Sequence, residues 1–466
     1  MKSKGIVRIE SLRLNNFKNI KNCEIYYDEA KKMERGILDE DDFSNVLGLY
    51  GQNGSGKTSC VEGFRVLQYL LSGASFNPTF KNMINIDSNS MTVGADFYVK
   101  VNKSNYFVNY DCTLGKIENG IQILEEKMSY HLLDENNKKV NIFSFKAPSD
   151  INGLFKDYLG NKNFEVYKMV ASLETKGNLT QISMFSSIFN PKLIQYVKSL
   201  KSEDDVYLNI IEELHFFALY RFAIYQINYF NEIVDVGIKI RVKDENNDAN
   251  PSCNDIFVSF DQTTINAKYF PLFKNTIDTI NKVLPSIIKD CTVELLDVVQ
   301  TKKQDINVVN DIVNFRLVSK KNGKYIPLFY ESNGIKKIVS ILSGLIDVFN
   351  NEGSFVAVDE LDSGIFEYLL GELVYAFDNF ALGQLFFTSH NLRILERVNS
   401  KSIFFSTIDS DNKFIQISSV RESNNLRNLY YKYIANGYKD KYKLYNNIKT
   451  EDIISSFKIN GGDKCD

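Results

Sequence analysis

Long apolar runs are missing from this 466-residue sequence. No stretch approaches the roughly 18 uninterrupted apolar residues that a membrane-spanning helix needs. The N-terminus, Met-Lys-Ser-Lys-Gly, also lacks the apolar segment of a secretory signal peptide. These absences argue against secretion and against fused membrane helices, so we expect a cytoplasmic protein with no membrane contact.

Cysteine and histidine are scarce, and tryptophan is absent. The six cysteines form no C-x-x-C pair, and reduced thiols in a cytoplasmic protein fit them best. The three histidines, His131, His215 and His390, are too scattered for a zinc site. The formal charge of −3 gives no overall basic signature, so a contact with nucleic acid would have to come from a local patch.

The sequence does contain a complete phosphate-binding P-loop pattern, G-x4-G-K-[ST]. A short apolar strand at 46–50 precedes it, and apolar residues at helical spacing follow it. In such a loop the backbone N–H groups face the phosphates, the lysine places a charge on them, and the hydroxyl residue binds Mg²⁺. We therefore expect ATP and Mg²⁺ at Gly51, Gln52, Asn53, Gly54, Ser55, Gly56, Lys57, Thr58 and Ser59, with Lys57 also catalytic and Thr58 a metal ligand.

A second motif follows about 300 residues later. Residues 354–360 form an apolar strand that ends in two carboxylates, which is the Walker B arrangement. Asp359 would hold Mg²⁺, and Glu360 would orient or polarise the attacking water. Its companions are Asp362-Ser363-Gly364, a second apolar strand ending in Ser389-His390, and a helix that opens at 331–337 with Ser332 and Gly334.

This order of motifs resembles that of ABC-type ATPases, and most of all the stand-alone cassettes related to the SMC, RecF and OLD ATPases. The segment 12–18, Leu-Arg-Leu-Asn-Asn-Phe-Lys, also resembles their first strand and turn. The resemblance covers roughly residues 6–130 and 310–410 and implies an α/β fold. It implies a P-loop NTPase core, ABC-ATPase-like, with an N-terminal antiparallel β subdomain and a helical insertion. Soluble members of this branch are common in bacterial anti-phage defence.

The resemblance also implies roles for the companion residues. Two cassettes of this family close head to tail around two ATP molecules, so Ser332 and Gly334 would contact the γ-phosphate bound by the opposite subunit. Asp362 would lie at the dimer seam, and His390 would sense the γ-phosphate as a catalytic residue. Other interpretations stay open: Ser332 as a simple N-cap, Asp362 as a turn residue, and His390 as a hydrogen-bonded histidine at a strand end. The Q-loop glutamine of the family has no clear counterpart, since Gln122 lies in strand-like sequence.

The pattern along the chain predicts four parts. Residues 1–148 would hold the P-loop half of the cassette, with strands at 6–27, 91–101, 105–114 and 120–133. Residues 149–290 would be mainly helical, with helices over 205–232 and from Pro271 toward Leu284 and a loop at 244–254. Residues 291–420 would complete the cassette, with strands at 292–300 and 311–319. Residues 421–466 would form a basic, aromatic tail.

The C-terminal tail is the one segment whose local charge is clearly basic, in contrast to the formal charge of −3 for the whole sequence. Seven basic residues between 421 and 449 face two acidic ones and alternate with tyrosines. This mixture could bind single-stranded nucleic acid by charge and stacking, or an acidic protein partner. A helix that packs its tyrosines on the cassette is the alternative.

The motifs favour an ATP-hydrolysing switch that forms a homodimer or higher homo-oligomer around ATP and controls a separate effector protein, with anti-phage defence as the setting. A DNA-repair ATPase of the RecF or SMC kind is an alternative, although no sustained heptad pattern predicts a long coiled coil. An OLD-type nuclease is disfavoured because only 76 residues follow His390, and Asp409 and Asp411 sit in a polar turn. A signalling GTPase is disfavoured because N-K-x-D is absent.

Overall fold

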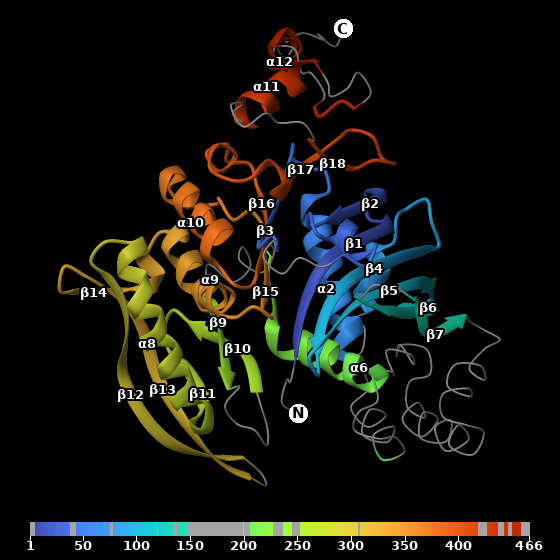
Figure 1. The fold of residues 1–466 in the computed structure, drawn as a ribbon. Coiled ribbons are helices and arrows are strands. Elements are labelled where there is room, and N and C mark those ends of the chain that lie inside the picture. The colour runs from blue at the N-terminus through green and yellow to red at the C-terminus, as the bar shows by residue number, and fades with distance from the viewer. Residues whose placement is uncertain are drawn as a thin grey trace, which may run out of the picture.

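The computed structural model describes residues 5–37, 43–74, 78–118, 120–133, 138–146, 199, 206–226, 236–244, 252–305, 308–417, 426–436, 442–445 and 450–457. A central sheet separates two β-rich regions, one built around β1, β4 and β5 and the other around β12 and β13 (Figure 1).

The central sheet has the strand order β18-β17-β3-β16-β15-β8, and every neighbouring pair except β17–β18 is parallel. Its strands are short and apolar because a parallel sheet is covered on both faces. They are β3 (Val46–Tyr50), β8 (Phe222–Tyr225), β15 (Phe355–Val358), β16 (Gln384–Ser389), β17 (Ile403–Ser406) and β18 (Phe414–Gln416). Since parallel strands bring their carboxyl ends to one edge, the segments after β3, β8, β15 and β16 meet there.

Helices cover both faces of this sheet. On one face, α2 (Lys57–Ser72) and α6 (Val206–Phe216) share a core with Phe355 and Phe386. On the other face, α9 (Asn333–Asn350) and α10 (Glu367–Phe380) pack around Val356 and Leu385. The P-loop helix and the helix of the predicted signature therefore lie on opposite sides of β15, which ends one residue before Asp359 (Figure 1).

An antiparallel sheet with the order β2-β1-β4-β5-β6-β7 packs against α2. Its strands are β1 (Ile6–Phe17), β2 (Ile20–Tyr26), β4 (Ser90–Val101), β5 (Ser104–Ile117), β6 (Gly120–Leu132) and β7 (Val140–Lys146), which confirms the strands predicted in this part. The short helix α1 (Ala30–Met33) lies between β2 and β3. Buried Gln384 joins the two sheets, because its amide accepts from the Ile9 N–H at 2.8 Å and donates to the Ile9 carbonyl at 2.7 Å.

A third core lies on the far side of α9. The hairpin β9 (Gly237–Asp244) and β10 (Ser252–Ser259) packs there with β11 (Thr263–Asn266), β12 (Cys291–Asp305), β13 (Val308–Lys321), β14 (Lys324–Pro327) and α8 (Phe270–Ile287). Helix α8 and strands β12 and β13 confirm the elements predicted from Pro271 and at 292–300 and 311–319. Val339 and Leu342 of α9 join this core, so the signature helix is held between it and the central sheet.

The expectation of a mainly helical stretch at 149–290 stays a prediction, and the part of it that the structure describes contains strands as well as helices. Helices α6 and α8 are present, but β8, β9, β10 and β11 are strands. The predicted helix at 205–232 ends at Phe216, passes through a π-type turn at Phe217–Arg221, and becomes β8. A short apolar run buried on both faces has no distinguishing period, which is why Phe222–Tyr225 continued the helical pattern. Residues 147–198 and most of the predicted loop at 244–254 lie outside the described residues. The α/β fold with a P-loop between a parallel strand and a helix is confirmed.

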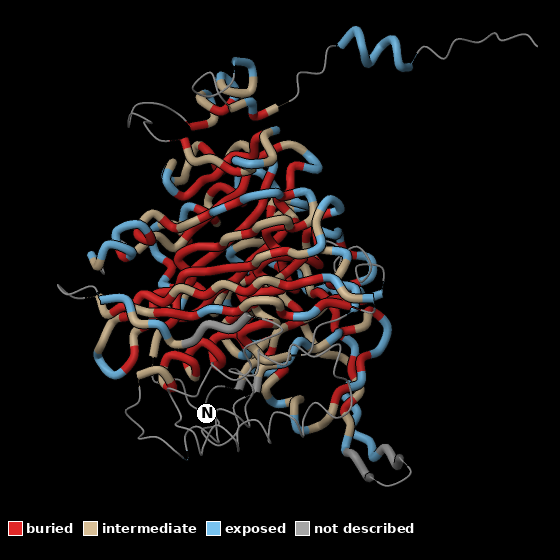
Figure 2. Tube along the Cα trace, turned by 90° about the vertical axis from the view of Figure 1, so that its right-hand side faces the viewer, coloured by how far each residue is buried: buried red, intermediate tan, exposed pale blue. Residues whose placement is uncertain are grey.

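The tail packs partly on the cassette. Helix α11 (Leu426–Asn436) buries Leu426 and Tyr430 in the core of the central sheet, and the Tyr430 ring stacks on Phe405 at 4.8 Å. Arg427 pairs with Glu396 at 2.6 Å. Helix α12 (Thr450–Phe457) buries none of its residues (Figure 2). The packed-helix alternative therefore holds for α11.

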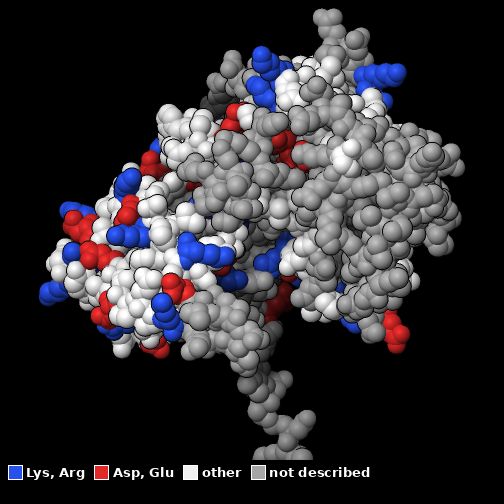
Figure 3. Space-filling model, turned by 90° about the horizontal axis from the view of Figure 1, so that it is seen from below, with Lys and Arg blue, Asp and Glu red and all other residues white. Residues whose placement is uncertain are grey.

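Charged side chains of both signs occur on the described part of one face of the molecule (Figure 3). Over the described part of the face in Figure 3, Lys and Arg side chains alternate with Asp and Glu. Within the described residues, no helix has the length and apolar character that crossing a bilayer requires.

Candidate nucleotide-binding site

The P-loop connects β3 to α2 at the carboxyl edge of the central sheet. Gly56 caps α2 with a φ of 97°, a left-handed conformation that glycine adopts without a Cβ penalty. The first N–H groups of a helix have no intrahelical partner, which suits an anion. A cavity of about 340 Å³ lies over the loop and is lined by Lys18, Asn19, Asn53, Gly54, Ser55, Gly56, Lys57, Thr58, Ser59, Glu360 and His390.

Lys57 is the main cation of this cavity. Its ammonium donates to the carbonyls of Gly51 at 2.9 Å and Gln52 at 3.0 Å, so those two loop residues lie beneath it and do not line the cavity. Burial lowers the pKa of Lys57 to about 8, while Asp359 and Glu360 oppose that shift. A phosphate placed beside this ammonium would stabilise its charge, which is the role predicted for the residue.

Asp359 lies fully buried just after β15, and its two carboxylate oxygens have different surroundings. The Oδ1 atom accepts from the Thr388 hydroxyl at 2.6 Å and from the Thr58 hydroxyl at 3.4 Å. The Oδ2 atom is buried with no hydrogen-bond partner among the described residues. A buried carboxylate oxygen in that condition is costly unless a cation or donor satisfies it.

Mg²⁺ fits this arrangement. It is usually held in proteins by one or two carboxylates, with phosphate oxygens and water completing the shell. Asp359 and Thr58 would hold it, and it would neutralise charge on the β- and γ-phosphates. Within the described part of the chain, no group of three or more His, Cys, Asp or Glu residues is placed to hold a metal.

Glu360 lines the cavity next to Asp359. Its φ of 43° is left-handed, which is unusual for a residue with a side chain, and its N–H donates to the Thr388 hydroxyl at 2.7 Å. Burial, together with the charges of Asp359 and Asp362, raises the pKa of the Glu360 carboxyl above its ordinary value. A carboxylate with a raised pKa is better suited to accept a proton from water.

His390 also lines the cavity, at the end of the neighbouring strand β16. Its backbone N–H donates to Oδ2 of Asp362 at 3.0 Å, which links the two segments that follow β15 and β16. Reduced hydration in the cavity, and then the charge of Lys57, lower the pKa of the His390 imidazole. Asp362 itself does not line the cavity.

Ser332 and Gly334 are not among the residues that line this cavity. Ser332 is exposed and caps α9, since its hydroxyl accepts from the Ile335 N–H at 3.4 Å. Gly334 packs against Gly364 so closely that a Cβ at 334 would lie 1.8 Å from the Gly364 carbonyl oxygen. Ser332 therefore does not reach the cavity over the P-loop of its own chain.

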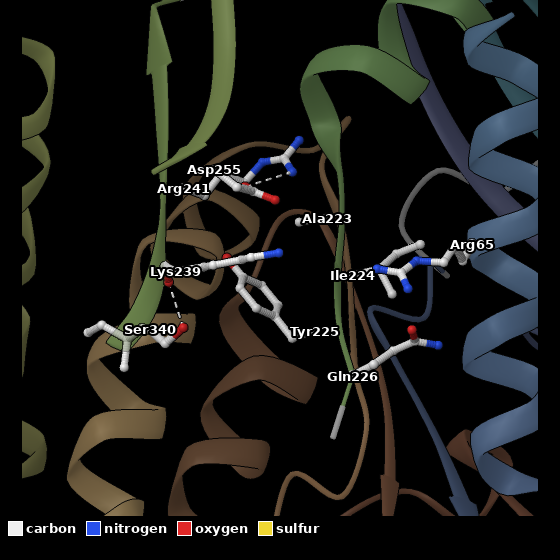
Figure 4. Close-up of a pocket in the computed structure, with 10 residues that line it drawn as sticks. Arg65, Ala223, Ile224, Tyr225, Gln226, Lys239, Arg241, Asp255 and Ser340 are labelled. Atoms are coloured by element: carbon white, nitrogen blue, oxygen red, sulfur yellow. Dashed lines mark hydrogen bonds and ion pairs between the residues drawn. The ribbon is translucent and has the colours of Figure 1, made fainter. Parts of the chain in front are cut away.

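Gln226 was not among the site residues predicted from the sequence. This residue follows β8, which pairs in parallel with β15, and the Tyr225 carbonyl accepts from the Asp359 N–H at 2.8 Å. Its amide is 5% exposed, and its Nε2 atom has no hydrogen-bond partner among the described residues. Figure 4 shows Gln226 at the end of β8, in a cavity of about 50 Å³ that Arg65 also lines. Gln122, by contrast, is exposed on β6 of the antiparallel sheet.

Thr388 and Asn19 were also missed. Thr388 is buried and connects Asp359 to the backbone of Glu360, as described above. Asn19, in the turn between β1 and β2, donates to the Gly54 carbonyl at 2.8 Å and accepts from the Ser59 hydroxyl at 3.1 Å. A polar residue at a turn gave no local signal that it would support a loop 35 residues away.

Comparisons with known proteins give distant structural likenesses. No family model and no curated protein matches the sequence. The fold is similar to the Smc head domain of Pyrococcus furiosus bound to the C-terminal domain of ScpA, at 13% identity and a TM-score of 0.39, over 89% of this chain and 97% of that one. It is similar to the SMC head domain of Thermotoga maritima, at 13% identity and a TM-score of 0.35, over 88% of this chain and 100% of that one. It is also similar to the recombination mediator RecF with ATP, at 14% identity and a TM-score of 0.35, over 89% of this chain and 100% of that one.

Proposed function

We propose that this chain is a Mg²⁺-dependent ATPase. The observation that carries the proposal is the convergence of four motif side chains, Lys57, Thr58, Asp359 and Glu360, at one edge of a parallel sheet. Thr58 and Asp359 contact each other although 301 positions separate them in the chain. Such an edge is where α/β proteins bind nucleotides.

Each of these residues has a distinct task in the proposed reaction. Lys57 binds the β- and γ-phosphates, and the P-loop N–H groups orient them. Thr58 and Asp359 hold the Mg²⁺. Glu360 orients the attacking water and accepts its proton, helped by its raised pKa.

The outward position of the signature supports an ATP-dependent homodimer. Ser332 faces solvent, and large exposed aromatic side chains flank it and the Asp362 turn. These are Phe329, Tyr330, Phe366 and Tyr368, exposed by 53%, 76%, 75% and 56%. Exposed aromatic side chains on the segments before α9 and after Asp362 suit a surface that a second copy covers. Closure would bring Ser332 and Gly334 to the γ-phosphate of the partner copy, with Asp362 at the seam and His390 near that phosphate.

We propose further that this ATPase acts in the cytoplasm as a switch for a separate effector protein, in anti-phage defence. The support for this part is the motif resemblance to the soluble SMC, RecF and OLD branch. Affinity capture with the ATP-trapped Glu360→Gln protein from its native host tests it. Recovery of an ATP-dependent partner whose removal abolishes phage resistance is the expected result, and unchanged resistance in a strain lacking this chain would contradict it.

Phosphate release from Mg²⁺-ATP tests the enzymatic proposal. The Glu360→Gln protein should bind a fluorescent ATP analogue like the wild type but hydrolyse ATP about 10²–10⁴-fold more slowly, since a positioned general base contributes about that much. Lys57→Ala should lose binding. Undiminished hydrolysis by Glu360→Gln would refute the assignment, and so would a wild-type protein that binds no ATP.

A further inference from the structure

The signature helix α9 contains two consecutive buried lysines with different surroundings. Lys336 is 6% exposed, and its ammonium lies over the rings of Phe260 and Phe329, 4.8 and 5.7 Å from their centroids. Lys337 is 5% exposed, and its ammonium donates to the backbone carbonyl of Glu360. Lys336 is thus directed to the third core, whereas Lys337 reaches the segment that follows β15.

The carbonyl that Lys337 contacts belongs to an unusual backbone conformation. A left-handed φ costs a residue with a side chain about 1–2 kcal/mol, so the surroundings must hold Glu360 in place. The surroundings hold Glu360 by hydrogen bonds to both its backbone N–H and its backbone carbonyl. The N–H donates to Thr388 at 2.7 Å, and the carbonyl accepts from Lys337 and from the Ser363 N–H at 2.9 Å.

A buried ammonium at this position has a clear energetic cost. Burial lowers the pKa of Lys337 to about 8, although the nearby carboxylates of Asp362, Glu360 and Asp359 favour its charged form. A methionine would fill the same volume without that desolvation. The lysine therefore contributes something that packing alone does not, and its contact with Glu360 indicates what that is.

The same helix also begins at the proposed contact with the second copy. Ser332 caps α9 at its exposed end, and Lys337 follows five positions later on the buried side. The first turn is further held against the segment after Glu360 by the close backbone contact of Gly334 with Gly364. One rigid element thus connects the surface that would meet the partner's nucleotide to the catalytic carboxylate of its own chain.

We propose that Lys337 is a positioning residue for hydrolysis: it fixes the backbone of Glu360 and makes the placement of that carboxylate depend on the signature helix. Docking of Ser332 on the nucleotide of the partner copy then affects the position of the Glu360 carboxylate in the subunit to which this Ser332 belongs. This inference rests on the proposed ATPase function and adds a regulatory connection to the same site.

The test compares Lys337→Met with Lys336→Met in the full-length protein. Lys337→Met should lower kcat at least about tenfold, because a displacement near 1 Å at a reacting group costs up to about 10²-fold. Its dissociation constant for a fluorescent ATP analogue should stay within about threefold of the wild type, since Lys337 does not line the cavity. Lys336→Met, which removes an equally buried ammonium from the same helix, should keep kcat within about twofold.

A double-variant measurement separates positioning from a general effect on folding. In the Glu360→Gln background, Lys337→Met should cause no further loss of hydrolysis, because it acts through Glu360. Equal kcat losses in the two lysine variants, or a wild-type kcat in Lys337→Met, would overturn the inference. If Lys337→Met does not fold, Lys337→Gln is measured in its place, and the same kcat comparisons decide whether the inference holds. These outcomes leave the ATPase proposal intact as long as the wild type hydrolyses ATP and Glu360→Gln does not.

Discussion

Replacing Gly334 by alanine should remove hydrolysis while sparing ATP binding. The added Cβ would lie 1.8 Å from the Gly364 carbonyl oxygen, whereas ordinary contacts begin near 3.4 Å. The two backbone segments must therefore move apart by 3.4 − 1.8 = 1.6 Å, because no side-chain rotation relieves a clash with backbone. Gly334 is buried and its φ is not left-handed, so alanine carries no backbone penalty of its own.

A shift of that size falls on the segment that follows Glu360. We expect kcat to drop about 10²-fold or more, because misplacement by about 1 Å has such effects at reacting groups. The free energy of unfolding should fall by about 1–3 kcal/mol, as for other overpacked sites. ATP affinity should be little changed, since neither glycine lines the cavity.

Steady-state phosphate release, binding of a fluorescent ATP analogue and urea unfolding measure the three quantities. Gly323→Ala in the β13–β14 turn is the control, because a Cβ there meets nothing within 4 Å. Its φ of 75° should cost about 1–2 kcal/mol of stability without lowering kcat. A Gly334→Ala protein with wild-type kcat would refute the close packing of the two motifs as a requirement for catalysis.

Three further outcomes follow from the packing of other residues. Burial raises the pKa of Glu10 to about 8 from 4.5, so the folded state keeps a proton that the unfolded state releases between those values. The free energy of unfolding should fall as pH rises through that window, by up to about 1.4 kcal/mol per unit, and urea titrations of Glu10→Gln should lack this part of the slope. Tyr430→Ala should cost about 2–4 kcal/mol of unfolding free energy because it empties the contact with Phe405, whereas half-exposed Tyr431→Ala should stay within about 0.5 kcal/mol. Gln226→Ala should lower kcat about tenfold or more at saturating Mg²⁺-ATP if its buried amide serves the site, and an unchanged rate would assign it to packing alone.

The sequence predicts those parts of the site that are local motifs. Lys57 and Thr58 belong to one loop whose function needs only a strand before it and a helix after it, and Asp359 and Glu360 end a short apolar strand. Spacing within a few residues specifies both pieces. Their meeting at one edge could be expected because parallel strands place their carboxyl ends together.

Residues that only tertiary packing brings to the site were not predictable in this way. Lys337 reaches Glu360 because α9 lies against β15, and no spacing in the sequence expresses that contact. Gln226 offered a signal that could have been used. It follows a short apolar run, as Asp359 and His390 do, but the run continued the helical pattern of α6 and was taken for helix.

Tertiary packing also decided the nature of the tail. Leu426 and Tyr430 are buried, so α11 belongs to the cassette, whereas the exposed α12 can be removed without opening a core. A truncation meant to probe partner binding should therefore keep α11 and remove α12.

The proposed ATP-dependent homodimer is tested most directly by the mass of the Glu360→Gln protein in solution. This mass is measured by light scattering with and without Mg²⁺-ATP. A single chain has a mass of 53.5 kDa. We expect a shift to twice that mass when Mg²⁺-ATP is added, and no shift when Ser332→Arg is introduced, although the protein with Ser332→Arg should still bind ATP. A Glu360→Gln protein that binds ATP and keeps the same mass under both conditions would contradict it.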